Sequence, residues 1–247
     1  MKSFFKNTKI SQMSDSFLTA IFIVFSGGFQ DAYTYMCRGE VFANAQTGNI
    51  VLMAANLFQR EFSHCLRYLI PVVSFMIGTF VAEQIHSAFK HYEKIHWRQI
   101  IILIEIVLLF AVGFISQRHN ALANAVVSFV CAMQVQTFRK VRGHVYASTM
   151  CIGNMRSAIV SLFAFFEFKD KKILQKSFVY FGVILIFAIG AGFGSVVTRA
   201  LGEKAIWVCC AFLAISFAIM FIDLELNERV AQRQKDKKDK IVFILES

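Results

Sequence analysis

The sequence has few charged residues and almost no proline. Of its 247 residues, 17% are charged and one is a proline, whereas 57% are hydrophobic and 28 are phenylalanine. A soluble domain carries roughly 25% charged residues, so this chain has too little polar surface to coat a water-soluble globule. The composition excludes an ordinary soluble protein and favours a chain whose side chains mostly face lipid.

Several catalytic and metal-binding motifs are also missing. The chain contains no Walker loop, no dinucleotide fingerprint and neither the H-E-x-x-H nor the G-x-S-x-G motif. Its six cysteines form no C-x-x-C pair and lie in or beside apolar runs, as small hydrophobic residues do. His86, His91 and His96 are spaced by five and do not share a helix face, which argues against a metal site. We therefore expect no enzyme, no catalytic residue, no cofactor and no metal.

The net charge of +10 is not spread over a surface. The basic residues are confined to the joints between apolar runs and to the C-terminal tail. This placement is typical of membrane topology and not of a face that binds a nucleic acid duplex. We expect the lipid bilayer, and no nucleic acid, as a partner.

One stretch of the chain occurs twice. Residues 38–49 read RGEVFANAQTGN and residues 142–154 read RGHVYASTMCIGN, and both are flanked by long apolar runs. Gln30 and Gln134 each precede the Arg-Gly pair by eight residues. The sequence therefore predicts two membrane repeats, 16–117 and 118–225, between an N-terminal arm (1–15) and a charged tail (226–247).

Each repeat contains four apolar segments. The second segment of the first repeat has only about ten apolar residues, or roughly 15 Å of helix, which is half a bilayer. A Gly190-x-x-x-Gly194 pair in the third segment of the second repeat suits close helix packing. The expected segments are 17–36, 49–58, 69–88 and 100–115, then 121–138, 155–168, 178–197 and 205–222.

The distribution of Lys and Arg decides between two topologies. If all eight segments span, the joints carry ten basic residues on one side and nine on the other. If 49–58 and 155–168 dip in and return, the division becomes thirteen against six. The positive-inside rule selects the second arrangement and places both termini in the cytoplasm. The predicted fold is all-α, with six transmembrane helices and two re-entrant half-helices in two inverted repeats, because three spans per repeat turn the second repeat upside down.

The half-helices indicate where a solute could bind. In inverted repeats, broken helices meet near the midplane and offer their N-terminal amide groups to a guest. Gly48-Asn49 and Gly153-Asn154 stand where these helices would begin, and Asp31 is an acid inside a span, which costs roughly 2.5–3.5 kcal/mol. The predicted substrate-binding residues are Gln30, Asp31, Thr47, Gly48, Asn49, Gln134, Gly153 and Asn154.

Each of these features also has a structural explanation. The two Gly-Asn pairs could simply be capped helix starts in buried turns, and Asp31 could pair with Arg38. Glu105 fits a structural role better than a functional one. Arg38 and Arg142 fit best as anchors that snorkel to the lipid headgroups.

The first copy of the motif also carries a family resemblance. GGFQDAYTYMCRGEVFANAQTGNIVLMAANL, together with HVYASTMCIGNMRSA in the second copy, closely resembles the signature of the YoaK-like bacterial membrane protein family, a permease-like domain of unknown function. The similarity spans roughly residues 15–225. The resemblance implies an integral membrane protein of bacteria and brings no established substrate.

These observations predict a multi-pass protein of the bacterial inner membrane. The expected function is a small secondary transporter, or permease, of a small polar or anionic solute. The alternative is a non-transporting scaffold or regulator that binds a partner through its basic tail. Assembly into a homo-oligomer stays open.

Overall fold

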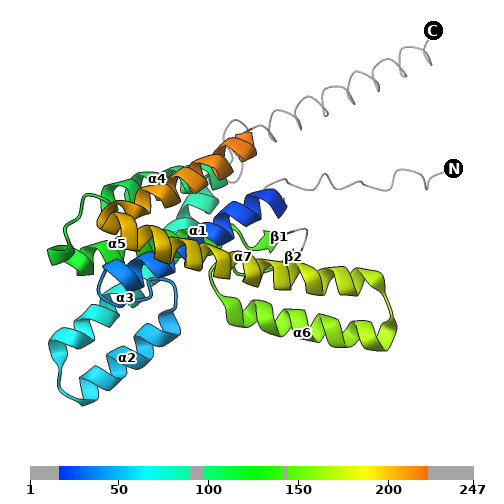
Figure 1. The fold of residues 1–247 in the computed structure, drawn as a ribbon, viewed down its shortest axis with the longest axis horizontal. Helices are drawn as coiled ribbons and strands as arrows, with labels where there is room; N and C mark the ends of the chain where they lie inside the picture. The colour runs from blue at the N-terminus through cyan, green and yellow to red at the C-terminus, as the bar shows by residue number, and fades with distance from the viewer. Residues whose placement is uncertain (1–16, 90–96, 142–143, 222–247) are drawn as a thin grey trace, which may run out of the picture.

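A computed structural model describes residues 17–89, 97–141 and 144–221, and nearly all of them are helical (Figure 1). The helix continues from η3 over residues 206–221. The elements are α1 (Phe17–Cys37), α2 (Gln46–Phe58), α3 (Phe62–Phe89), α4 (Trp97–Val112), η2 (Gln117–His119), α5 (Asn120–Thr137), β1 (Lys140–Val141), β2 (His144–Val145), α6 (Cys151–Phe168), α7 (Lys171–Leu201) and η3 (Gly202–Ala205).

Two helical hairpins, α2–α3 and α6–α7, project from a central group of helices in different directions (Figure 1). Each hairpin turns at a residue in the left-handed region, Arg60 with φ 64° and Lys169 with φ 54°. The side chain of Asp170 then accepts a hydrogen bond of 2.8 Å from the backbone N–H of Lys172 and so caps α7. The tight turns bring each short helix back alongside the long helix that follows it.

The described residues bury many polar side chains beside an apolar core and expose many large apolar side chains. Gln30, Arg38 and Gln134 are completely buried, whereas Phe58 is 90% exposed. Such an exposed apolar surface suits lipid. By length and composition, three helical stretches within the described residues can cross a membrane. They are Phe62–Phe89, Cys151–Phe168 and Lys171–Phe221.

Glycines set the closest helix crossing, between α1 and α7. A Cβ atom on Gly28 would collide with the backbone of α7 at Phe187, and one on Gly190 would collide with the backbone of α1 at Phe25. A Cβ atom on Gly194 would lie 2.9 Å from the Cα of Phe29. The predicted close packing at Gly190 and Gly194 is confirmed. In the same way α3 packs on α5, where Gly78 leaves room for the backbone of Phe129.

Side-chain hydrogen bonds show that α1 and α5 run antiparallel. The side chain of Asn124, near the start of α5, donates to the carbonyl oxygen of Arg38, just after the end of α1, at 2.9 Å. Gln134, near the end of α5, donates to the carbonyl oxygen of Ile23, near the start of α1, at 3.0 Å. These two helices occupy equivalent places in the two sequence repeats.

The short segments differ in part from their predicted bounds. The first begins three residues earlier than expected, at Gln46, and remains short at 13 residues. The second was predicted at 155–168, whereas α6 begins at Cys151, has 18 residues and is long and apolar enough to span. The reason is that Gly153 and Asn154 lie inside the first turn of α6 and do not precede it. The arm 1–15 and the tail 226–247 lie outside the described residues.

Candidate functional site

The starts of α2 and α6 line one cavity of about 470 Å³. The two copies of the repeated motif therefore meet in space, although they are about a hundred residues apart in the chain. The walls come from α1, from the segments leading into the two short helices, and from α7. The lining residues are Asp31, Phe42, Asn44, Ala45, Gln46, Thr47, Thr149, Met150, Cys151, Ile152 and Phe187.

Neither short helix has a side-chain cap. The N-cap residues are Ala45 for α2 and Met150 for α6, and neither side chain accepts a hydrogen bond from the helix. The first backbone N–H groups of a helix have no partner within the helix. In α2 those of Gln46 and Gly48 donate to the carbonyl oxygens of Asn44 and Ala45 at 3.1 Å and 3.0 Å, so it is the start of α6 that chiefly offers N–H groups to a guest or to water. The expected capping by Asn49 and Asn154 was wrong, because both lie inside the helices.

The two glycines of the motif face open space. A Cβ atom at Gly48 or Gly153 would meet no atom within 4 Å beyond its own turn of helix. Neither has a positive φ. The backbone at these glycines therefore needs no conformation that is special to glycine, and the glycines leave the helix starts uncovered.

Asp31 is the charged residue of the cavity wall. It is 8% exposed, and its Oδ1 accepts a hydrogen bond of 3.0 Å from the backbone N–H of Asn44, just before α2. The side chain of Asn44 in turn donates to the carbonyl oxygen of Gly27 at 3.0 Å. Among the described residues Asp31 has no salt bridge, so the pair with Arg38 that we considered does not form.

Asn49 and Asn154 make the same contact in the two repeats. The amide of Asn49 donates to the carbonyl oxygen of Phe42 at 2.9 Å, and that of Asn154 donates to the carbonyl oxygen of Ala147 at 2.8 Å. In both cases the acceptor lies seven residues earlier. These side chains tie each short helix to the segment before it, and neither is among the residues that line the cavity.

Gln30 and Gln134 also hold helices together. Gln30 donates to the buried carboxyl group of Glu105 at 3.1 Å, and Gln134 donates to Ile23 and, at 3.4 Å, to Ser148. Of the eight predicted residues, the structure therefore places Asp31 and Thr47 on the cavity wall and the other six around it. Whether any of the eight binds a solute stays a prediction.

Sequence reasoning missed most of the cavity wall. Asn44, Gln46 and Thr149 belong to the repeated motif, so their place in it was a signal that could have found them. Phe187 gave no such signal, because it reaches the cavity through the crossing of α7 with α1. Its role could be read only from the packing.

Arg38 does not anchor to headgroups, contrary to our expectation. It is completely buried, and its guanidinium donates to Tyr33 Oη at 2.8 Å and 2.6 Å and to the carbonyl oxygens of Val112 and Ile115 at 3.0 Å and 2.7 Å. Those carbonyls belong to the C-terminal end of α4, where a cation is favourable. Arg38 thus joins the end of α1 to the end of α4.

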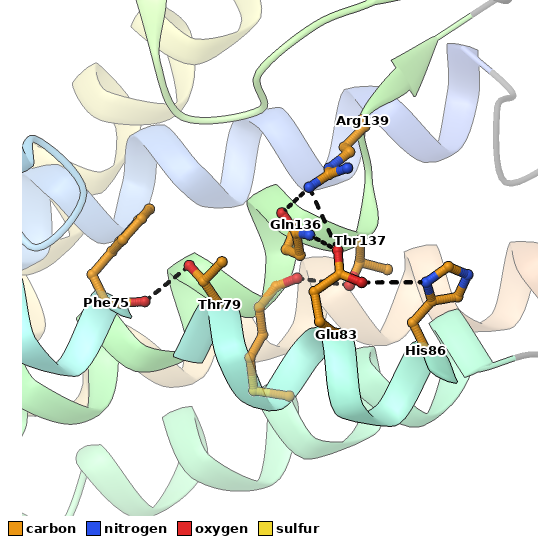
Figure 2. A network of polar contacts seen from close by, with 8 residues as sticks. Phe75, Thr79, Glu83, His86, Gln136, Thr137 and Arg139 are labelled. Carbon is orange, nitrogen blue, oxygen red and sulfur yellow. Dashed lines mark hydrogen bonds and ion pairs between the residues drawn. The ribbon is translucent and has the colours of Figure 1, made fainter. Parts of the chain in front are cut away.

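A second polar network joins α3 to the end of α5 (Figure 2). Glu83 accepts from the amide of Gln136 and lies 3.5 Å from His86 and 3.6 Å from Arg139. Gln136 also accepts from Arg139. These groups are largely exposed, and such exposed ion pairs contribute little to stability. The ends of α3 and α5 lie on the same side of the molecule as the start of α4, because the ring centroids of His86 in α3 and Trp97 in α4 are 4.4 Å apart.

Comparison with known proteins adds a family and no activity. A family model described as "Protein of unknown function (DUF1275)" matches residues 19–219, which is most of the chain. No curated protein and no solved structure matches the chain significantly. The match supports a membrane-protein family of unknown function, whereas the YoaK-like name stays a prediction.

Proposed function

The chain belongs to the DUF1275 family of proteins of unknown function, and on that premise we propose that it is a small secondary transporter of a small polar or anionic solute. In this proposal it resides in the bacterial inner membrane with both termini in the cytoplasm. It acts without a cofactor and performs no chemical reaction.

Contacts between helix ends support six spans over eight. If all eight segments spanned, the end of α1 and the end of α4 would lie on opposite faces of the membrane. Arg38 instead bonds to Val112 and Ile115. Eight spans would likewise separate Gln117 from Glu203, yet the backbone N–H of Gln117 donates to Glu203 Oε1 at 2.7 Å. With six spans, α2 and α6 each enter and leave the bilayer at the same face. Both residues of each pair then lie at one face.

The packing also supports an inverted relation between the repeats. The first helix of each repeat packs against the third helix of the other, α1 on α7 and α5 on α3, and the equivalent helices α1 and α5 run antiparallel. Two equivalent helices that run in opposite directions are expected from an axis lying in the membrane plane.

The single observation that carries the proposal is the shared cavity of the two uncapped helix starts, with Asp31 on its wall. At 1.5 Å per residue, α2 extends about 20 Å and α6 about 27 Å from this cavity to their tips. In the inverted arrangement the tips lie at opposite faces, which puts the cavity at depth in the bilayer. Unsatisfied backbone groups at that depth are tolerated where they line a wet cavity, as a solute path requires.

A ligand screen with matched variants tests this proposal. Purified protein is heated with a panel of amino acids, carboxylates, amines and sugars, and any compound that raises Tm is then tested for flux into liposomes. We expect at least one compound to stabilise and cross with the wild type but not with Asp31→Asn. Glu61→Gln, an exposed acid at the α2–α3 turn, is the control and should leave both unchanged. No stabilising compound, or unchanged flux in Asp31→Asn, would contradict the proposal.

The second candidate function is a scaffold or regulator that uses the basic tail, residues 226–247. Deletion of the tail distinguishes the two functions. The transporter predicts unchanged flux after deletion, whereas the scaffold predicts no flux at all and loss of partner binding.

A further inference from the structure

One side of the cavity wall carries a carboxylate oxygen without a hydrogen-bond partner among the described residues. Asp31 uses Oδ1 for the N–H of Asn44, and its Oδ2 has no hydrogen-bond partner among the described residues. Asn44 is 1% exposed, and its side-chain oxygen is buried without a partner in the described part of the chain. A buried acceptor that lacks a partner costs about 1–3 kcal/mol. A guest that donates hydrogen bonds and carries positive charge would satisfy Asp31 Oδ2, whereas the buried oxygen of Asn44 is out of its reach.

The start of α6 provides the opposite polarity. Asp31 accepts a hydrogen bond from the backbone N–H of Asn44, just before α2. The positive end of α2 therefore already has a carboxylate beside it. The equivalent position of the second repeat, 104 residues later, is Val135. The uncapped start of α6 therefore lacks a counterpart of Asp31, and Cys151 and Ile152 of its first turn are among the residues that line the cavity. A helix start of this kind favours a negatively charged group.

The rest of the wall is apolar. Phe42, Met150, Ile152 and Phe187 surround the space between the two polar ends. The cavity volume of about 470 Å³ lies within the range of roughly 300–1,000 Å³ that is usual for small-molecule sites. A purely anionic guest would have to lie beside Asp31 without compensation, and a sugar would leave the charge of Asp31 unpaired.

From these contacts we propose that the guest is a small zwitterion with an apolar body, an amino acid with an aliphatic side chain. Its ammonium group binds Asp31, its carboxylate binds the amide groups at the start of α6, and its side chain contacts Phe42 and Phe187. The assignment rests on the proposed function and narrows its solute class.

A native cysteine offers a direct reporter of occupancy. Cys151 lines the cavity and is partly exposed, whereas Cys37, Cys65, Cys131, Cys209 and Cys210 are buried. N-ethylmaleimide should therefore label Cys151 first in the folded protein, and Cys151→Ser identifies that signal. A bound guest slows the labelling by the factor 1 + [L]/Kd, which is about ten-fold at a concentration ten times Kd.

The test compares three probes of similar shape, in sodium and in choline buffers. L-leucine carries both charges, isoamylamine lacks the carboxylate and 4-methylpentanoate lacks the ammonium. We expect L-leucine to protect Cys151 at lower concentration than either analogue. Asp31→Asn should weaken the protection by L-leucine and by isoamylamine but not the protection by 4-methylpentanoate. Glu61→Gln should change the protection by none of the three probes.

Four outcomes would overturn the assignment. They are equal protection by 4-methylpentanoate and L-leucine, protection by L-leucine that survives Asp31→Asn, protection by sodium alone, and no protection or no labelling of Cys151 at all. The ligand screen separates these results from failure of the transport proposal. If another compound stabilises the wild type and crosses in an Asp31-dependent manner, transport stands and only the zwitterion class is wrong.

Discussion

The side-chain amide of Gln30 donates a hydrogen bond of 3.1 Å to the carboxyl group of Glu105, and both side chains are completely buried. The other oxygen of each group, Gln30 Oε1 and Glu105 Oε2, has no partner among the described residues. Glu105 lies in α4 and Gln30 precedes the cavity residue Asp31 in α1. The pair therefore ties α1 to α4, which agrees with the structural role that the sequence favoured for Glu105.

Replacing Glu105 by Gln should be tolerated. The variant keeps an acceptor for Gln30 and adds a donor for its unpartnered oxygen, and no lysine or arginine of the described chain pairs with Glu105. Glu105→Ala should lower the free energy of unfolding by about 1–3 kcal/mol, because it leaves the buried Gln30 amide with only its weak 3.9 Å contact to Cys209 Sγ. Thermal unfolding in detergent measures both. A Glu105→Gln variant as unstable as Glu105→Ala would show that the charge itself is required.

The α1–α7 crossing should not tolerate a methyl group. Gly28→Ala and Gly190→Ala place a Cβ atom against the backbone of the facing helix, and overpacking of this kind costs about 1–3 kcal/mol. Gly192→Ala is a matched control on α7, since its Cβ would meet nothing within 4 Å. We expect a lower Tm for the first two variants and an unchanged Tm for the control. Equal Tm values for all three would contradict the crossing.

Asn49→Ala and Asn154→Ala should destabilise the protein by similar amounts. Each removes the same side-chain bond to a carbonyl oxygen seven residues earlier, at a cost of about 1–3 kcal/mol. If these residues instead bound the solute directly, each variant would lose affinity while keeping its Tm. Parallel thermal and ligand-protection measurements separate the two roles.

Arg38→Lys should be strongly destabilising despite its conserved charge. Arg38 uses the separate nitrogens of its guanidinium for Tyr33, Val112 and Ile115, and one ammonium group cannot reach all three in that geometry. Each acceptor left without a partner costs about 1–3 kcal/mol. Arg199→Lys, at an exposed position of α7, is the control. Comparable unfolding curves for the two variants would refute the buried role of Arg38.

The repeated motif predicted more of the site than its individual residues did. The repeated Gly-Asn pairs lie in the first turns of two helices, and the starts of those helices share one cavity. The residue-level prediction was weaker, because Asn49 and Asn154 bond to backbone within their own segments. A sequence shows that an amide is available but not which carbonyl oxygen lies near it.

Long-range contacts explain the remaining differences. Arg38 was expected at the headgroups because its partners, the last carbonyl groups of α4, lie more than seventy residues away. Phe187 and Glu83 reach their partners only through the crossings of α7 with α1 and of α3 with α5. The periodicity of one segment cannot predict such contacts, since they depend on how two segments pack.

The position of the two hairpin tips tests the central claim most directly. Single cysteines are introduced as Gln59→Cys, at the α2–α3 turn, and Lys172→Cys, at the start of α7, each in a Cys151→Ser background. Labelling of intact and opened bacterial cells with a membrane-impermeant maleimide then reports the face of each tip. Inverted repeats with re-entrant α2 and α6 predict that residue 59 is labelled in intact cells and residue 172 only after opening. Labelling of both on the same face would mean that α2 and α6 cross the whole bilayer, and the cavity between their starts would not lie on a path through the membrane.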